Sequence, residues 1–221
     1  MAVSTTAGEV ERAFLFADLC GYTALTEAHG NRQAAEVVER FLAIATTTLR
    51  PGASILERIG DEVVIVAADA AVAVATALAL RQLVAREPMF PVVRAAIHAG
   101  PVVERPGGYV GAALNVAARV AALAAPGQIV CTGPVQRAVT LAGVSYRALG
   151  PVRLKNIRVP VEIFEVVATA DDDAHVDPVC RMQVNAGDAV AVEVWQGRAY
   201  HFCSEDCAAA FRARPAEYAP G

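Results

Sequence analysis

The segment LERIGDEVVIV (residues 56–66) places two extended, largely apolar runs on either side of Gly60 and Asp61. A Gly-Asp pair between such runs is typical of a tight turn, because both residues tolerate the backbone angles that β-hairpins require. We therefore expect two antiparallel strands here. The segment also carries a second acid, Glu57, four residues before Asp61. Whether the two carboxylates share one role depends on what surrounds the hairpin.

The segments around this hairpin alternate between strand-like and helix-like patterns. Residues 31–50 repeat apolar side chains at helical spacing, and residues 69–87 form an Ala-rich helical pattern that begins at a capping residue, Asp69. The remaining expected elements are strands at 13–19, 92–100, 127–132 and 162–168, a helix at 113–125 and a loop at 106–111. This β-α-β-β-α-β order with additions predicts an α+β fold around a mostly antiparallel sheet.

Composition and hydropathy indicate a folded protein that binds neither nucleic acid nor membrane. Of its 221 residues 55% are hydrophobic, and its net charge of −4 is opposite to that of general nucleic-acid binders. Residues 63–80 are long enough for a membrane span and hold a single charge, Asp69. That run changes at Asp69 from β-branched to Ala-rich, which favours a buried strand and then a buried helix. Without a signal-peptide pattern at residues 1–12, we expect a cytoplasmic protein.

Asp18 and Asp61 are candidate ligands for a hard divalent cation. Asp18 ends the first expected strand, and Asp61 lies in the hairpin. If the first strand lies beside the hairpin, both carboxylates reach one edge of the sheet, where they would suit Mg²⁺ or Mn²⁺ and a phosphate substrate. The loop formed by Cys20, Gly21, Tyr22 and Thr23 precedes a helix, a favourable place for phosphate oxygens. From spacing alone, both acids could equally be turn or capping residues.

Asn115 and Arg119 form a second candidate pair. They are four residues apart on one expected helix, so they share a face, and both are polar on an otherwise apolar helix. They could contact a ribose and a phosphate, where arginine can stabilise charge developing at phosphorus. An exposed helical face would give the same pattern.

Five segments, in order, resemble the class III nucleotide cyclases. They are FLFADLCGYTALTE (14–27), ERIGDEVVIV (57–66), AAIHAGPVV (95–103), GYVGAALNVAARVAALAAPGQIV (108–130) and LGPVRLKNIRVPVEIFEV (149–166). The resemblance implies a ferredoxin-like catalytic domain over residues 8–168 that works as a homodimer. It implies that the enzyme cyclises ATP or GTP, with release of pyrophosphate, by two-metal catalysis with Mg²⁺ or Mn²⁺.

The resemblance also implies a role for single residues. Asp18 and Asp61 would hold both metal ions in one subunit, while Asn115 and Arg119 of the other subunit would orient the ribose and stabilise the transition state. Lys155 would contact the triphosphate. A cyclase-like dimer that has lost catalysis and serves as a nucleotide- or metal-responsive regulator is the alternative.

Two positions that read the base in this family depart from its usual residues. Adenylate-forming members typically carry lysine and aspartate where this chain has Glu57 and Gly108, and guanylate-forming members typically carry glutamate and cysteine. A carboxylate accepts the two donors of guanine and opposes the acceptor N1 of adenine, so Glu57 favours GTP. Gly108 favours neither base.

The C-terminal residues predict a small metal-binding module after a linker. Asp171, Asp172 and Asp173 indicate a solvated linker over 169–176. Residues 177–219 then hold Cys180, Cys203 and Cys207, a thiol content that suits Zn²⁺ or copper, although buried cysteines in a small core would look the same.

The module resembles the YHS domain through YHFCS (200–204), Phe211, Pro215 and Tyr218. The resemblance implies metal binding through the three cysteines and leaves the role of His201 open. Because the two parts are linked covalently, the module is a candidate regulator of the cyclase.

Overall fold

The computed structural model describes residues 8–87, 89–168, 174–185 and 187–219. Its chain forms two compact units, one from Met1–Asp18, Leu49–Leu78 and Arg94–Thr169, the other from Leu19–Thr48, Ala79–Val93 and Ala170–Gly221. No helix among the described residues is both long and apolar enough to cross a membrane.

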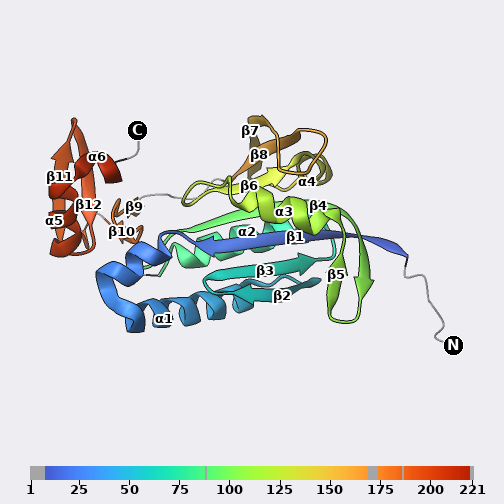
Figure 1. Cartoon of the computed structure of the whole chain (residues 1–221), viewed down its shortest axis with the longest axis horizontal. Helices are drawn as coiled ribbons and strands as arrows, with labels where there is room; N and C mark the ends of the chain where they lie inside the picture. Colours follow the sequence, from blue (N-terminus) through green and yellow to red (C-terminus); the bar gives the residue numbers. More distant parts are fainter. Residues whose placement is uncertain (1–7, 88, 169–173, 186, 220–221) are drawn as a thin grey trace. The chain divides into compact units, whose positions relative to one another are not determined.

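The first unit is built on one eight-stranded sheet in the order β2-β3-β1-β4-β6-β8-β7, with β5 paired to β4 (Figure 1). Pairs β1–β3, β2–β3, β4–β5, β6–β8 and β7–β8 are antiparallel, and β4–β6 is parallel. This arrangement confirms the predicted α+β fold with a mostly antiparallel sheet. The strands are β1 (Glu9–Leu19), β2 (Ala53–Ile59), β3 (Glu62–Ala67), β4 (Val93–Arg105), β5 (Gly108–Val110), β6 (Ile129–Thr132), β7 (Val144–Val152) and β8 (Val161–Ala168).

The central position of β1 follows from its apolar sequence. Its core residues Ala13, Phe14, Leu15 and Ala17 are all 0% exposed, as expected for a strand covered on both faces. It lies between β3 and β4, and its pairing with β3 sets Asp18 opposite Glu62. The predicted neighbourhood of the first strand and the hairpin is therefore confirmed.

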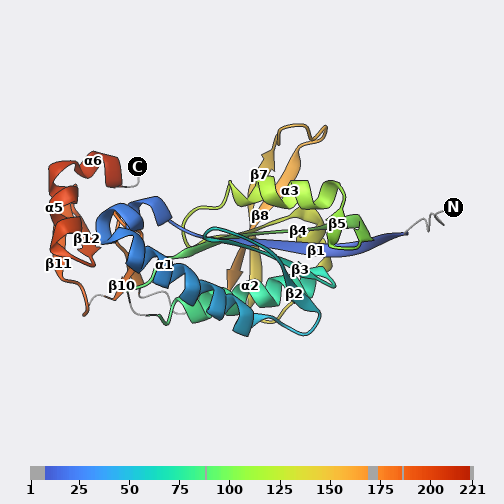
Figure 2. The ribbon, with the colours of Figure 1, turned by 60° about the horizontal axis from the view of Figure 1, so that its bottom comes forward.

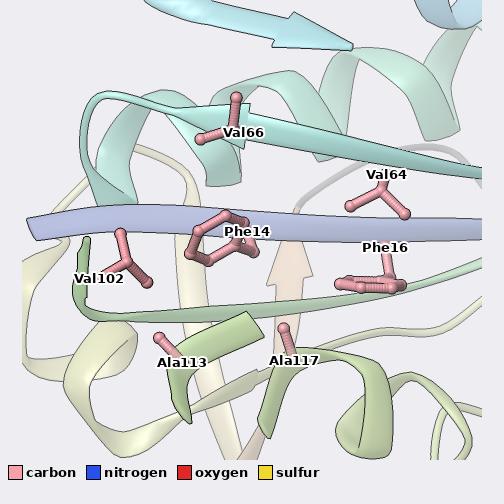
Figure 3. Packing of buried hydrophobic residues seen from close by; sticks show 7 residues of the cluster. All are labelled: Phe14, Phe16, Val64, Val66, Val102, Ala113 and Ala117. Atoms are coloured by element: carbon pink, nitrogen blue, oxygen red, sulfur yellow. The ribbon is translucent and has the colours of Figure 1, made fainter. Parts of the chain in front are cut away.

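Helix α3 (Ala112–Ala121) covers one face of this sheet (Figure 2). Side chains two residues apart on β1 and β3 point to that face, where they meet two alanines one helical turn apart on α3. Figure 3 shows this cluster, which consists of Phe14, Phe16, Val64, Val66, Val102, Ala113 and Ala117. The small alanines let the helix approach the aromatic rings closely.

The loop expected at residues 106–111 is a wrong prediction in part, because Gly108–Val110 form β5. Gly107 adopts a φ of 88°, which a side chain would oppose, and the chain turns back there to pair with β4. The short strand has too few residues for a clear period-two pattern.

In the second unit, α1 (Tyr22–Thr48) begins nine residues before the expected helix at 31–50. Gly30 interrupts it with φ 82° and ψ 163°, so that two helical segments meet at a kink. The sequence pattern reveals only the second segment, since the first is short and mostly polar. The last part of α2 (Ala70–Val84) belongs to this unit as well.

The rest of the second unit is the C-terminal module. Strand β9 (Ala174–Val176) pairs with β10 (Gln183–Asn185), and β11 (Ala191–Trp195) pairs with β12 (Arg198–Phe202). Helices α5 (Glu205–Ala213) and α6 (Pro215–Tyr218) follow. Part of the expected linker, residues 174–176, is thus a strand, and residues 169–173 lie outside the described residues.

His98 should make the first unit sensitive to acid. Its Nδ1 lies 2.7 Å from Oγ1 of Thr132, and burial lowers the pKa of His98 from 6.5 to about 4. Below pH 6.5 the unfolded chain gains a proton that the folded chain refuses until about pH 4, so stability falls through this window as pH falls. We expect His98 to contribute a loss on the order of 2–3 kcal/mol.

Urea unfolding at pH 7.5 and pH 4.5, compared between wild type and His98→Asn, measures this loss. The variant keeps a neutral polar group beside Thr132 and should lose less stability on acidification. His175→Asn, at an exposed histidine, is the control. An identical pH dependence in wild type and His98→Asn would contradict the prediction.

Candidate active site and metal centre

Three carboxylates gather where β1 ends and the β2–β3 hairpin turns. Asp18 and Glu62 are directly paired across β1 and β3, and Asp61 precedes Glu62 in the turn. Burial, followed by the charge of Asp18, raises the pKa of both Asp61 and Glu62. The cluster therefore resists carrying three negative charges without a nearby cation.

Arg94 of β4 is the positive group in this cluster. Its Nε and Nη2 atoms donate to Oδ2 of Asp18 at 2.8 and 2.5 Å, and the Asp18 side chain is only 15% exposed. Neither Arg94 nor Glu62 was predicted from the sequence. The available signal for Arg94 was a single arginine in the mostly apolar strand VVRAAIHAG (92–100).

A small pocket of about 130 Å³ lies at this ion pair. Phe16, Asp18, Glu62 and Arg94 line one part of it, and three alanines of the α3 region line the rest: Ala118, Ala121 and Ala122. Oxygen donors that repel one another suit a hard divalent cation. The residues present therefore fit Mg²⁺ or Mn²⁺, provided that the Arg94 guanidinium yields Asp18 to the ion.

Asn115 and Arg119 lie one turn apart on α3, as predicted, and Arg119 Nη1 donates to the Asn115 carbonyl oxygen at 3.1 Å. The buried face of α3 consists of Ala113, Val116, Ala117 and Val120. Asn115 is exposed and Arg119 is partly exposed. Neither is among the described residues that line the Asp18 pocket of the same chain.

The three other expected substrate residues of this unit have accessible positions. Glu57 is exposed on β2, where the pairing with β3 shifts register. A Cβ atom at Gly108 would lie 3.9 Å from Cδ1 of Leu56, the residue before Glu57. Gly108 thus lies beside Leu56, the neighbour of Glu57 on β2. Lys155 is exposed in the turn after β7.

The expected phosphate loop, residues 20–23, belongs to the second unit and leads into α1. The Cys20 amide donates to the Val92 carbonyl at 2.9 Å, and the Val92 amide donates to the Arg181 carbonyl at 3.2 Å. Gly21 has a φ of 77°, and a Cβ atom there would lie 2.7 Å from Cγ of Arg181. The loop is therefore packed closely on the segment that follows Cys180, a contact that the sequence did not reveal.

Four potential metal ligands converge in the second unit. Sγ of Cys180, Cys203 and Cys207 and a ring nitrogen of His29 all lie within 4.8 Å of one another. The three cysteines are buried, as they would be in either a metal site or a small core. Hydrogen bonding among the sulfurs, first with Cys203, raises the pKa of Cys180, and the bond with Cys180 lowers that of Cys207. The three sulfurs are therefore close enough to influence one another's acidity.

His201, the histidine nearest in sequence to these cysteines, is not part of the four-residue group. Its ring stacks on that of His175 with 3.7 Å between centroids and 7° between planes. The histidine of the group is instead His29 of α1, which was not predicted from the sequence. It lies 174 positions before Cys203, so no local spacing could have indicated it.

Comparison with known proteins identifies both parts of the chain. A YHS domain matches residues 175–221. A pH-sensitive adenylate cyclase of Mycobacterium tuberculosis is 34% identical over 155 residues, which cover 68% of this chain and 39% of that relative. The chain therefore spans less than half the length of this curated relative.

Solved cyclase structures share the fold. The adenylyl cyclase CyaB from P. aeruginosa matches with a TM-score of 0.63 and 21% identity, covering 75% of this chain and 97% of that one. An adenylate/guanylate cyclase/hydrolase from Silicibacter pomeroyi matches with a TM-score of 0.59 and 26% identity, covering 74% of this chain and all of the other. The N-terminal region of the chain thus matches a class III nucleotide cyclase domain, and its C-terminal end matches a YHS domain.

Proposed function

We propose that this chain converts ATP or GTP to the 3′,5′-cyclic monophosphate and pyrophosphate, as a phosphorus-oxygen lyase in the cytoplasm. The observation that carries the proposal is the pairing of β1 with the hairpin, which sets Asp18, a pocket residue, opposite Glu62 and near Asp61. Burial and the neighbouring Asp18 charge raise the pKa of Asp61, which is the electrostatic state expected of carboxylates built to share a cation.

Asp18 and Asp61 would hold two Mg²⁺ or Mn²⁺ ions. When bound, such ions stabilise a 3′-oxyanion nucleophile and the charge on the leaving pyrophosphate. Arg94 neutralises Asp18, because two of its nitrogen atoms donate to the Asp18 carboxylate. When Asp18 binds a metal ion, Arg94 would contact a phosphate oxygen of the substrate instead. Arg94 would thus keep the acidic pocket balanced before the substrate arrives.

Asn115 and Arg119 support a homodimeric site. Because α3 buries its opposite face in its own chain, these two side chains are available to a second subunit. There, Asn115 would orient the ribose, and the Arg119 guanidinium would stabilise charge on the phosphate in the transition state. Lys155 would bind the triphosphate, and the backbone N–H groups of Gly21, Tyr22 and Thr23 would donate hydrogen bonds to phosphate oxygens, whereas that of Cys20 already donates to the Val92 carbonyl.

The base preference depends on Glu57 and Gly108. The Glu57 carboxylate suits guanine, whereas the Mycobacterium tuberculosis relative is named an adenylate cyclase. Gly108 offers no side chain to either base, so discrimination should be weak. A difference of one buried hydrogen bond corresponds to about 1–3 kcal/mol.

Incubating the full chain with Mn²⁺ and either ATP or GTP, and measuring both cyclic products, tests the proposed function. We expect product from both nucleotides, with rates that differ by no more than about a hundredfold. Glu57→Lys should shift this ratio towards cyclic AMP because lysine donates to adenine N1. The matched control is Arg58→Lys, at the neighbouring exposed position. No product from either nucleotide would contradict catalysis.

A cyclase-like regulator without catalysis is the second candidate. Two features favour it: the Asp18–Arg94 ion pair and the missing side chain at Gly108. A dimer that only binds nucleotide could keep both of them. Nucleotide binding measured by calorimetry in the absence of any cyclic product would support this candidate over the first.

A further inference from the structure

His29 completes a four-ligand cluster that includes every cysteine of the YHS domain. The Sγ atoms of Cys180 and Cys203 are 3.3 Å apart, and those of Cys203 and Cys207 are 3.8 Å apart. Nε2 of His29 lies 3.8 Å from Sγ of Cys203. All four ligand atoms lie within 4.8 Å of one another, close enough to hold a metal ion together.

These separations agree with a tetrahedral site. Zn–S bonds of about 2.3 Å at tetrahedral angles place two sulfurs about 3.8 Å apart, and a Zn–N bond of about 2.0 Å places nitrogen and sulfur about 3.5 Å apart. The Cys203–Cys207 separation matches the first value, and the other two need adjustments of a few tenths of an ångström. Three sulfurs and one imidazole form a known zinc ligand set.

Buried hydrogen bonds hold the ligands in place. Asp177 is 0% exposed, and its carboxylate accepts from the backbone N–H of Cys180 at 3.3 Å and of Cys203 at 2.9 Å. Ser204 caps α5 by accepting from the Cys207 N–H. One carboxylate therefore fixes two of the three cysteine-bearing segments to each other, as supporting residues of metal sites commonly do.

His29 comes from outside the YHS domain. It is the last residue of the first helical segment of α1, immediately before the kink at Gly30. Without that kink, the helix would continue in one direction through this point. The break thus gives the first segment its own orientation, with His29 at its end beside the three sulfurs.

We propose that His29 Nε2 and the sulfurs of Cys180, Cys203 and Cys207 form a Cys₃His site for Zn²⁺, which ties the first segment of α1 to the YHS domain. Binding releases the remaining thiol protons to solvent, and no redox change is involved. The inference rests on the geometry of the second unit and stands whether or not the chain cyclises nucleotides.

Zinc binding at this site would also constrain the expected phosphate loop, residues 20–23. Residues 20–23 follow Asp18 and run into the first turn of α1, and Gly21 already packs on Arg181, next to the ligand Cys180. A metal ion that joins Cys180 to His29 would hold this part of the chain at two places, near Gly21 and at His29. Zinc occupancy would therefore set the mobility of the chain that follows Asp18.

The test measures Zn²⁺ binding by the reduced full chain, with metal content from mass spectrometry and affinity from competition with a chelating dye. Wild type should bind one Zn²⁺ per chain. Loss of a supporting residue typically costs 10–100-fold in metal affinity, so loss of a direct ligand in His29→Ala should cost at least about tenfold. His29→Cys should restore tight binding, and His201→Ala should match wild type.

Co²⁺ substitution supplies a second measurement that a purely structural role would not change. Tetrahedral thiolate coordination gives intense visible absorption, which His29→Ala should shift and weaken while its far-UV circular dichroism stays unchanged. Equal Zn²⁺ affinity and an equal Co²⁺ spectrum in wild type and His29→Ala would overturn the assignment of His29. The site itself would be overturned if the purified protein contained a Cys180–Cys203 disulfide and, once this disulfide was reduced, still took up no metal.

Discussion

Replacing Asp61 with asparagine is expected to lower cyclic nucleotide formation at least about a hundredfold at saturating Mn²⁺ and nucleotide. The amide keeps the shape of the side chain and removes the charge that a divalent cation needs. Initial rates of product formation, measured over a Mn²⁺ titration, check the result. The loss should persist at high metal if Asp61 acts in the transition state as well as in metal binding.

Stability separates this loss from misfolding. Burial and the Asp18 charge raise the pKa of Asp61, so its charged form is disfavoured in the folded protein. Asp61→Asn should therefore unfold at the same temperature as wild type or at a higher one. Glu62→Gln is the matched variant, since Glu62 lies in the same cluster but is not assigned to metal. Activity of Asp61→Asn within tenfold of wild type would contradict the assignment.

Mixing two inactive variants is expected to restore about a quarter of wild-type activity if the site is shared between subunits. Arg119→Ala should by itself cost about 10²–10³ in turnover, because it removes a charged donor aimed at the transition state. In a heterodimer with Asp61→Asn, one site receives an intact Asp61 from one chain and an intact Arg119 from the other. Random exchange makes half of the dimers mixed, each with one working site.

Two further mixtures serve as controls. Asp18→Asn mixed with Asp61→Asn should stay inactive, because both carboxylates of a site come from one subunit. Asn115→Ala mixed with Arg119→Ala should stay inactive for the same reason. Recovery in these controls, or its absence in the Asp61→Asn and Arg119→Ala mixture, would argue against the composite dimer.

Local sequence patterns sufficed for most of the fold. The hairpin at Gly60 and Asp61 was predictable because two extended apolar runs and the turn residues between them lie within about a dozen residues of sequence. The shared face of Asn115 and Arg119 followed from helical periodicity. The first segment of α1 and strands β5 and β7 escaped prediction. The first two are too short to show a period, and β7 is largely exposed and contains Gly150 and Pro151.

The candidate sites were predictable only in part, because their members meet through long-range contacts. Motifs in the sequence indicated Asp18, Asp61 and the three cysteines as candidate ligands. Arg94, however, lies 76 positions from Asp18, and its contact exists because β4 is placed beside β1. No pattern within either strand specifies that neighbour.

By itself, the sequence predicted most strands and helices of the N-terminal region, the resemblance to class III cyclases and the YHS domain, and the candidate ligands Asp18, Asp61, Cys180, Cys203 and Cys207. Tertiary structure alone decided that Glu57 stands apart from Asp61 on an exposed strand, that Arg94 neutralises Asp18, and that His29 rather than His201 joins the cysteines. The physical reason is that periodicity and turn chemistry are local, whereas ion pairs and metal sites depend on which distant segments packing brings within a few ångströms.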